Sequence, residues 1–103
     1  MMTPERFLSH LRERILVFDG AMGTNLQKQG LSADDFGGLE GCNEALNLFA
    51  PHAVRKVHAD FMVAGCRAVE TNTFGANRLT LAEYGLENKV DAINKAAVTI
   101  ARE

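Results

Sequence analysis

Two short segments typical of buried strands alternate with helical patterns along this chain, and this alternation restricts the fold more than any other feature. Residues 15–18 form a continuous apolar run that ends at Asp19. Residues 67–72 have an apolar centre and end in polar residues. Continuous apolar runs are typical of strands that are buried on both faces of a parallel sheet. Because helical patterns follow each segment, we expect an α/β fold of parallel strands with covering helices.

The clearest helical pattern begins at Pro51 and ends at Gly65. Proline is favoured at the first position of a helix, and glycine is favoured in the left-handed conformation that ends one. Between them, apolar residues recur every three to four positions, as on the buried face of a helix. The other expected helices cover residues 4–13, with Thr3 as its cap, and residues 24–29, 77–84 and 87–102, while residues 31–49 are expected to form a long loop.

The number of expected strands points to a larger closed sheet. Two parallel strands leave both outer edges unpaired, whereas a closed (β/α)8 barrel uses eight strands over roughly 250 residues and has no edges. We therefore expect residues 1–103 to form the first βα units, about a quarter, of a (β/α)8 TIM barrel. No linker or change of composition indicates a second domain.

Charge and composition exclude several classes of partner. The formal net charge is −2, so no cationic surface is expected to bind nucleic acid or an anionic membrane. The apolar runs are much shorter than the roughly 20 residues that cross a bilayer. Two cysteines without a secretory signal are typical of reduced thiols. We expect a soluble cytoplasmic protein.

Polar residues follow both expected strands, and they form the candidate site. The carboxyl ends of parallel strands share one face, so Asp19 and Gly20 should lie close to Glu70, Thr71 and Asn72. An aspartate can accept hydrogen bonds from a substrate ammonium, and a glycine lets backbone N–H groups approach a carboxylate closely. This set suits an amino acid zwitterion. The alternative is that the Asp-Gly pair only ends a strand and turns the chain.

Other readings of the motifs are weaker. Residues 20–24 join a strand to a helix, but they lack the lysine and the glycine spacing of a phosphate-binding loop. The cysteines and histidines show none of the close paired spacings of a zinc site. The acids of the long loop are expected only to solvate it; these are Asp34, Asp35, Glu40 and Glu44.

Three ordered segments resemble a known family. The sequences ILVFDGAMGT at residues 15–24, GCNEALNL at residues 41–48 and ETNTFGAN at residues 70–77 are similar to the N-terminal part of the homocysteine S-methyltransferase family. The similarity continues through LAEYGLE at residues 81–87 to the end of the chain. The long loop with GCNE at residues 41–44 looks more similar to the cobalamin-dependent methionine synthase branch than to the betaine-dependent or S-methylmethionine-dependent branches.

The resemblance implies a zinc ion, held by three cysteines, that binds the homocysteine thiol as a thiolate and presents it to a methyl donor. It also implies that Asp19, Gly20, Glu70, Thr71 and Asn72 bind homocysteine. The family's zinc cysteines include an adjacent pair, which this chain lacks, so we expect the zinc ligands beyond Glu103 and no catalytic residue within the chain. Cobalamin and folate belong to other domains of such enzymes. Residues 1–103 alone are therefore expected to be inactive.

Two alternatives remain open at this point. The chain could be a stand-alone α/β binding or interaction module without catalysis, which would protect its exposed strand edges by self-association. It could also be part of a betaine-dependent or S-methylmethionine-dependent homocysteine methyltransferase. The first alternative predicts that the protein does not methylate homocysteine. The second predicts that it does, but with a different methyl donor.

Overall fold

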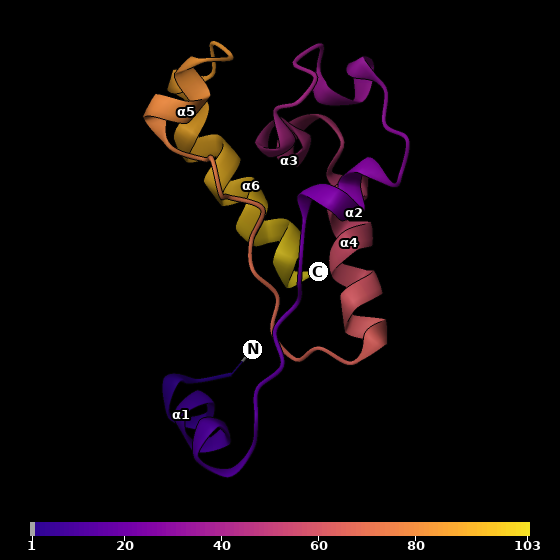
Figure 1. Ribbon diagram of the computed structural model, residues 1–103. Helices are drawn as coiled ribbons and strands as arrows, with labels where there is room; N and C mark the ends of the chain where they lie inside the picture. The colour runs from indigo at the N-terminus through magenta and orange to yellow at the C-terminus, as the bar shows by residue number, and fades with distance from the viewer. Residues whose placement is uncertain (1) are drawn as a thin grey trace.

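The computed structural model describes residues 2–103, which form an elongated molecule with extents of 45 × 27 × 19 Å. Its helical segments follow one another with irregular or extended chain between them (Figure 1). In chain order they are α1 (Pro4–Glu13), α2 (Gly23–Gln27), η1 (Ala33–Phe36), η2 (Asn43–Ala45), α3 (Leu46–Phe49), α4 (Pro51–Ala64), α5 (Arg78–Ala82), η3 (Glu87–Lys89) and α6 (Val90–Arg102), where η denotes a 3-10 helix.

The two helices with the clearest end signals form as expected. Thr3 caps α1, because its hydroxyl accepts a hydrogen bond from the Arg6 N–H at 3.2 Å. Pro51 opens α4, and Gly65 ends it in the left-handed conformation with φ of 115°. A residue with a Cβ rarely adopts that conformation, so glycine is the natural end point of this helix.

The expected long loop at residues 31–49 is wrong, because this segment contains η1, η2 and α3. A capping box begins η1: the Asp35 N–H donates to the Ser32 hydroxyl, and the Asp35 carboxylate accepts from the Ser32 N–H at 2.8 Å. These helices have three or four residues each. Segments this short do not show a helical period in the sequence, which explains why they were not predicted.

The expected α/β fold, with the first βα units of a TIM barrel and covering helices, is also wrong for the described residues. Among residues 2–103 the only β pairing is a single parallel bridge between Phe18 and Ala68. The Arg67 and Ala68 N–H groups donate to the Val17 carbonyl at 2.9 and 3.3 Å, and the Asp19 N–H donates to the Ala68 carbonyl at 3.0 Å. The chain folds as a helical assembly in which two extended segments touch once.

The physical reason lies in how helices and strands satisfy their backbone. A helix forms its hydrogen bonds within one segment, whereas a strand forms them only with neighbouring strands, and an unpaired edge leaves N–H and C=O groups without partners. Parallel strands also need both faces covered. Here Ile15 is 89% exposed and Val17 is 52% exposed, so the expected buried strand has no cover.

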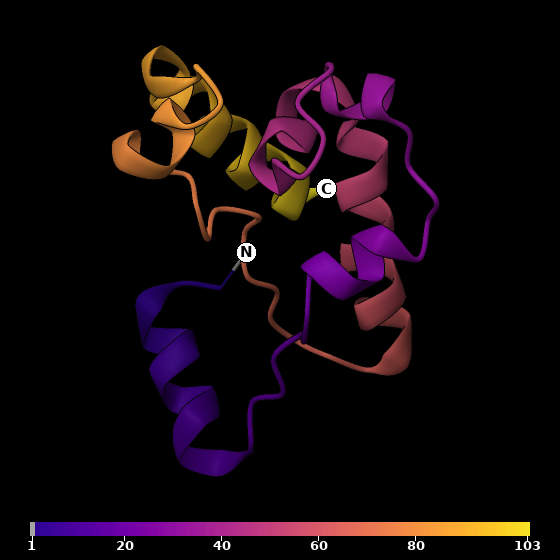
Figure 2. The same cartoon turned by 45° about the horizontal axis from the view of Figure 1, so that its top comes forward.

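Two apolar clusters hold the helical body together. The first lies between α2, α3, α4 and the end of α6, and the second joins the η2 region to α5 and α6. Figures 1 and 2 both show α4 and α6 side by side, with α3 near them. The fully buried members with the largest side chains are Leu26, Leu46, Val54, Val57, Leu81 and Ile93.

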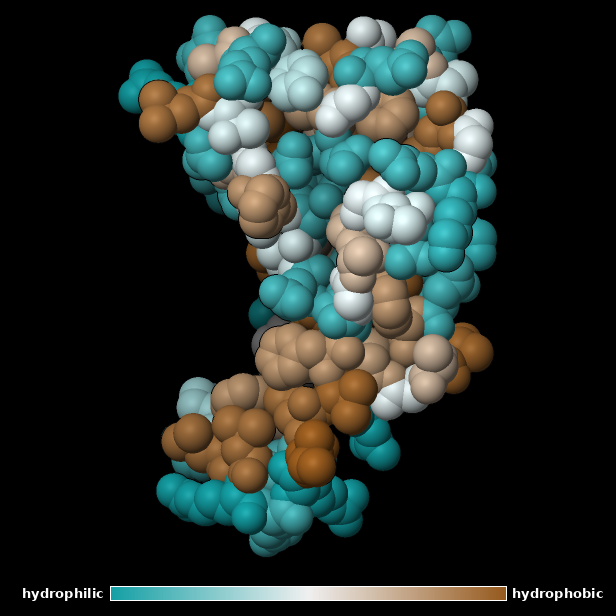
Figure 3. Space-filling view, viewed as in Figure 1, coloured by the Kyte–Doolittle hydropathy of each residue, from teal (hydrophilic) through white to brown (hydrophobic). Residues whose placement is uncertain are grey.

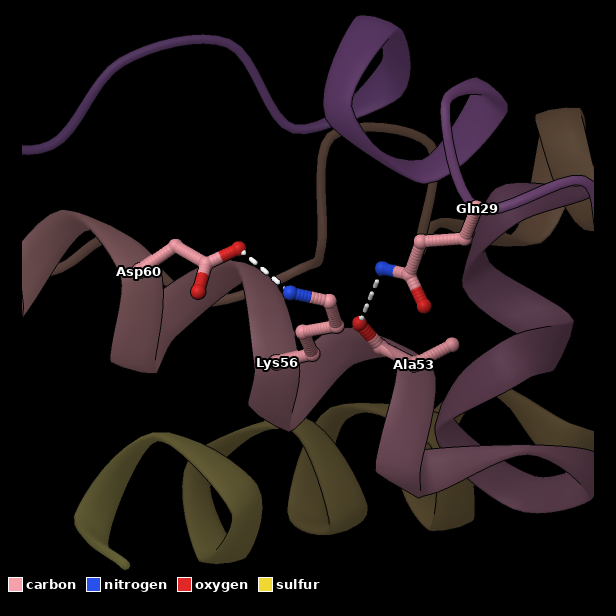
Figure 4. A network of polar contacts seen from close by, with 4 residues as sticks. All are labelled: Gln29, Ala53, Lys56 and Asp60. Atoms are coloured by element: carbon pink, nitrogen blue, oxygen red, sulfur yellow. Dashed lines mark hydrogen bonds and ion pairs between the residues drawn. The ribbon is translucent and has the colours of Figure 1, made fainter.

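A polar contact adds to the packing of α2 on α4. The Gln29 side chain, just after α2, donates from Nε2 to the Ala53 carbonyl at 2.9 Å, within the first turns of α4 (Figure 4). One turn further along, Lys56 and Asp60 form an exposed ion pair at 2.9 Å. Exposed pairs of this kind add only about 0.3–0.5 kcal/mol, so the apolar contacts dominate the stability of this region.

The first helix lies apart from this body. No residue of α1 is buried, and Figures 1 and 2 show it at one end of the molecule. The apolar side chains of α1 and of the extended segment after it gather on one surface (Figure 3), and they include Phe7, Leu8, Leu11, Ile15, Val17 and Phe18. None of the described helices has the length and hydropathy of a membrane span.

Leucine truncation on α5 tests the second cluster. Leu81 is fully buried, whereas Leu79 on the same helix is 86% exposed. We expect Leu81→Ala to lower the free energy of unfolding by about 2–5 kcal/mol, because it leaves a cavity. Leu79→Ala is the matched control and should change it by less than about 0.5 kcal/mol. Urea unfolding followed by circular dichroism measures both, and equal effects would contradict this packing.

His58, on the inner face of α4, is buried with only 5% of its surface exposed. Neither ring nitrogen has a hydrogen-bond partner. Burial lowers the pKa of His58 below its usual value of 6.5, and the negative charge of Asp19 opposes this shift only in part. The neutral imidazole therefore fits the folded state better than the charged one.

The pH dependence of stability follows from this shift. The unfolded chain takes up the His58 proton at a higher pH than the folded chain does, so the stabilisation is complete above about pH 6.5 and is lost as the pH falls. We expect His58→Leu to flatten the dependence of the unfolding free energy between about pH 7 and pH 5.5. The exposed His52 on the same helix supplies the control, His52→Leu, which should keep the wild-type slope. An identical slope in all three proteins would refute this role.

Candidate functional site

The five predicted site residues line one cavity of about 420 Å³; they are Asp19, Gly20, Glu70, Thr71 and Asn72. The cavity lies where the two extended segments end, beside the residues that precede α3. Although the segments form only one bridge, that bridge is next to Asp19 and two residues before Glu70. One backbone contact is therefore enough to bring together the polar residues that follow the two extended segments.

Asp19 is held in place by the backbone of the other segment. Its two carboxylate oxygens accept hydrogen bonds from the Glu70 N–H, at 3.1 Å to Oδ1 and 3.2 Å to Oδ2. The side chain is half-buried at the cavity. A carboxylate fixed in this way keeps further acceptor capacity for a cationic group such as an ammonium.

Gly20 allows the chain to pass close to α4. A Cβ atom at this position would come within 3.2 Å of the Phe61 ring, which is tighter than ordinary packing. Gly20 has no positive φ, so the absence of a side chain serves this close approach and not an unusual backbone conformation. The same absence leaves its backbone accessible to a small polar ligand at the cavity.

Thr71 lies in a hydrogen-bonded turn that follows the second extended segment. Its hydroxyl is 2.8 Å from the hydroxyl of Thr73, and the Thr73 N–H donates to the Thr71 carbonyl at 2.9 Å. The turn places Phe74 at the edge of the cavity, where its side chain is fully exposed. The cavity therefore combines polar side chains with two apolar ones, Met22 and the exposed Phe74.

Asn72 anchors the wall of the cavity to the helical body. Its side-chain Nδ2 donates to the Asn43 carbonyl at 2.9 Å and to Oδ1 of Asn47 at 3.0 Å. In return, Nδ2 of Asn47 donates to the carbonyls of Asn72 at 2.9 Å and Ile93 at 3.3 Å. Asn47 and Asn72 are both buried, and their amides join α3, α6 and the second extended segment.

Five further residues line this cavity that were not predicted from the sequence, and two of them, Asn43 and Glu44, form hydrogen bonds that hold its walls. Asn43 lines it and accepts the hydrogen bond from Asn72. Glu44 also lines it, and its Oε2 accepts a hydrogen bond from the Gly75 N–H at 3.1 Å. The expectation that Glu44 only solvates a loop is therefore wrong. The available signal is the GCNEALNL segment itself, which resembles the family but does not reveal what its individual residues do.

Both cysteines are free, as the cysteine usage predicted, and both are buried. Burial is the main cause that raises the pKa of the Cys42 thiol, and the nearby Glu44 carboxylate raises it further, against hydrogen bonds from the backbone of Ala45 and Glu44. A metal-binding cysteine has the opposite property, because it binds as a thiolate. Within residues 2–103, no group of three or more histidine, cysteine, aspartate or glutamate side chains has the geometry to hold a metal ion.

Comparison with known proteins places this chain within a described family. The family model for homocysteine S-methyltransferase matches residues 16–103. The methionine synthases of Mycobacterium tuberculosis and Mycobacterium leprae are each 45% identical to this chain over 95 residues. These alignments cover 92% of the chain but only 8% of each relative. The chain thus corresponds to a small part of those proteins.

A double-mutant cycle tests the buried amide pair. We expect Asn47→Ala and Asn72→Ala each to lower the unfolding free energy by about 1–3 kcal/mol, because each leaves buried partners unsatisfied. The double variant should lose less than the sum, with a coupling energy of about 0.5–3 kcal/mol. Asn88→Ala, at an exposed position, is the control. Strict additivity, measured by urea unfolding, would contradict the direct contact.

Proposed function

This chain belongs to the homocysteine S-methyltransferase family, and on that premise we propose that it is the N-terminal part of the homocysteine-binding domain of a methionine synthase. The observation that carries the proposal is the Asp19 carboxylate, held by the Glu70 amide at a cavity of about 420 Å³. The family match supplies the ligand class, and the cavity supplies the acceptor that an amino acid requires.

The cavity residues have separate roles in this proposal. Asp19 accepts hydrogen bonds from the homocysteine ammonium, and the backbone at Gly20 approaches the substrate carboxylate. Glu70, Thr71 and Asn72 form the opposite wall, where the Glu70 amide orients Asp19 and the buried Asn72 fixes the wall to the body. Two charged ends recognised at fixed points leave the side chain of the amino acid, with its sulfur, free to point out of this part of the site.

The reaction in this proposal is methyl transfer to sulfur. Homocysteine loses its thiol proton, the sulfur forms a bond to the methyl carbon of the donor, and the bond between that carbon and the donor breaks to give methionine. The described residues that line the cavity include no cysteine, histidine or lysine. We therefore assign this chain to binding and orientation, and we assign no catalytic residue within it.

The zinc implied by the family does not fit the residues of this chain. Cys42 is buried with a raised pKa, and no suitable ligand group exists among the described residues. We propose that zinc, cobalamin and folate are bound by other parts of the complete protein, and that methylcobalamin or methyltetrahydrofolate supplies the methyl group. We also propose a cytoplasmic location, because free cysteines persist in a reducing compartment.

The exposed apolar surface of α1 and residues 15–18 supports the view that other parts of the protein contact this chain (Figure 3). Contiguous apolar surface of this kind marks a site of interaction. We propose that the rest of the homocysteine-binding domain covers it in the complete protein. In isolation, the same surface would favour self-association of residues 1–103.

Substitution of Asp19 in the complete protein tests the proposed function. Asp19→Asn retains an oxygen for the Glu70 amide but loses the negative charge, so we expect KM for homocysteine to rise about 10–100-fold with little change in kcat. Asp91→Asn, in an exposed ion pair with Lys95 on α6, is the control and should leave KM unchanged. Methyl transfer from radiolabelled donor measures both. No methylation of homocysteine by the complete protein, or an unchanged KM in Asp19→Asn, would refute the proposal.

A further inference from the structure

Glu44 connects two walls of the cavity that are far apart in the sequence. It lies in η2, is half-buried, and lines the cavity together with Asn72 and Phe74. Its Oε2 accepts the hydrogen bond from the Gly75 N–H at 3.1 Å. The residue before it, Asn43, accepts a hydrogen bond from Asn72 at 2.9 Å. Two neighbouring residues of η2 therefore hold two points of the turn after the second extended segment.

Gly75 is pressed between Glu44 and α5. A Cβ atom at this position would lie 3.0 Å from Cγ2 of Thr80 and 3.2 Å from Oε1 of Glu44. Gly75 is buried and its φ is not positive, so only the close approach requires glycine here. The short distance from the Gly75 backbone to the carboxylate depends on this lack of a side chain.

The turn held by Glu44 determines where the edge of the cavity lies. The Thr73 N–H donates to the Thr71 carbonyl at 2.9 Å, and the Ala76 N–H donates to the Thr73 carbonyl at 3.1 Å. Between these two bonds lie Phe74 and Gly75, and Phe74 has no packing of its own because its side chain is fully exposed. The hydrogen bond from Gly75 to Glu44 is therefore the contact that fixes the middle of the turn.

We propose that Glu44 is a positioning residue of the homocysteine pocket, which sets the shape of the wall from Thr71 to Phe74 through the backbone of Gly75. This inference rests on the proposed function, because it concerns the same cavity. Glu44 acts through an acceptor oxygen and not through its charge on the substrate. A glutamine at this position keeps an oxygen acceptor of similar reach, whereas an alanine removes it.

Amide hydrogen exchange on residues 1–103 tests the contact without any enzyme assay. We expect Glu44→Ala to speed exchange of the Gly75 N–H by about tenfold or more, since a lost hydrogen bond exposes that amide. Glu44→Gln should keep the rate within about threefold of the wild type. Glu40→Ala, an exposed acid in the preceding segment, is the control and should leave the rate unchanged. Unaltered exchange at Gly75 in Glu44→Ala overturns the proposal.

Kinetics of the complete protein test the positioning role. We expect Glu44→Ala to raise KM for homocysteine about tenfold or more, and Glu44→Gln to restore it to within about threefold of the wild type. Gly75→Ala disturbs the same contact from the other side and should also raise KM, which keeps the test valid if Glu44→Ala does not fold. An unchanged KM in Gly75→Ala, or equal losses in the Gln and Ala variants, overturns the proposal, the latter because it shows that the charge itself is needed.

The two proposals fail in different ways. If the complete protein does not methylate homocysteine, the proposed function fails, and the exchange rate of Gly75 still reports whether Glu44 holds the turn. If Asp19→Asn raises KM but Glu44→Ala and Gly75→Ala do not, the proposed function stands and the positioning role of Glu44 is refuted.

Discussion

The hydrogen bonds between Asn47 and Asn72 are the interaction on which the rest of this structure depends. Both side chains are buried, and each amide group forms its hydrogen bonds with the other residue and with backbone carbonyls of Asn43 and Ile93. Burying an amide costs free energy unless the amide is hydrogen-bonded. Each of these two side chains therefore needs the other as a partner in order to be buried. Their mutual requirement fixes α3, α6 and the second extended segment in one arrangement.

The same pair defines where the cavity lies. Asn72 follows Glu70, whose N–H is bound to the Asp19 carboxylate, so anchoring Asn72 also limits how far Asp19 can move. Apolar packing alone would not achieve this, because dispersion and hydrophobic contacts have little directional preference. The polar network therefore supplies orientation, and the two apolar clusters supply most of the stability.

The helices of this fold could be predicted where both ends carry a chemical signal. Thr3 and Pro4 mark the start of α1, and Pro51 and Gly65 mark the two ends of α4. The strand prediction for residues 15–18 was wrong because an apolar run indicates only that a segment favours burial, and not which structure buries it. Whether it joins a sheet depends on neighbours that the run does not encode, and in this structure Ile15 and Phe18 remain exposed.

The proximity of the five candidate residues was predicted better than the fold that was expected to bring them together. Asp19, Gly20 and residues 70–72 come together because polar residues follow each extended segment and the single bridge aligns the two. Glu44 could not be found in this way, since its partner is a backbone N–H that has no signature in the sequence. A glutamate in a glycine-rich segment looks the same whether it faces solvent or holds a turn.

Cys42 lies close to the cavity, and its burial and pKa determine how reactive its thiol is. Cys42 is adjacent to the two η2 residues that line the cavity, yet only 1% of its surface is exposed. Burial and the Glu44 carboxylate both raise its pKa, so at neutral pH it stays a protonated thiol. A thiol is a much weaker nucleophile than a thiolate, and a buried one does not reach a methyl donor. The Glu44 carboxylate that accepts the hydrogen bond from Gly75 therefore also helps to keep the neighbouring Cys42 sulfur protonated and unreactive.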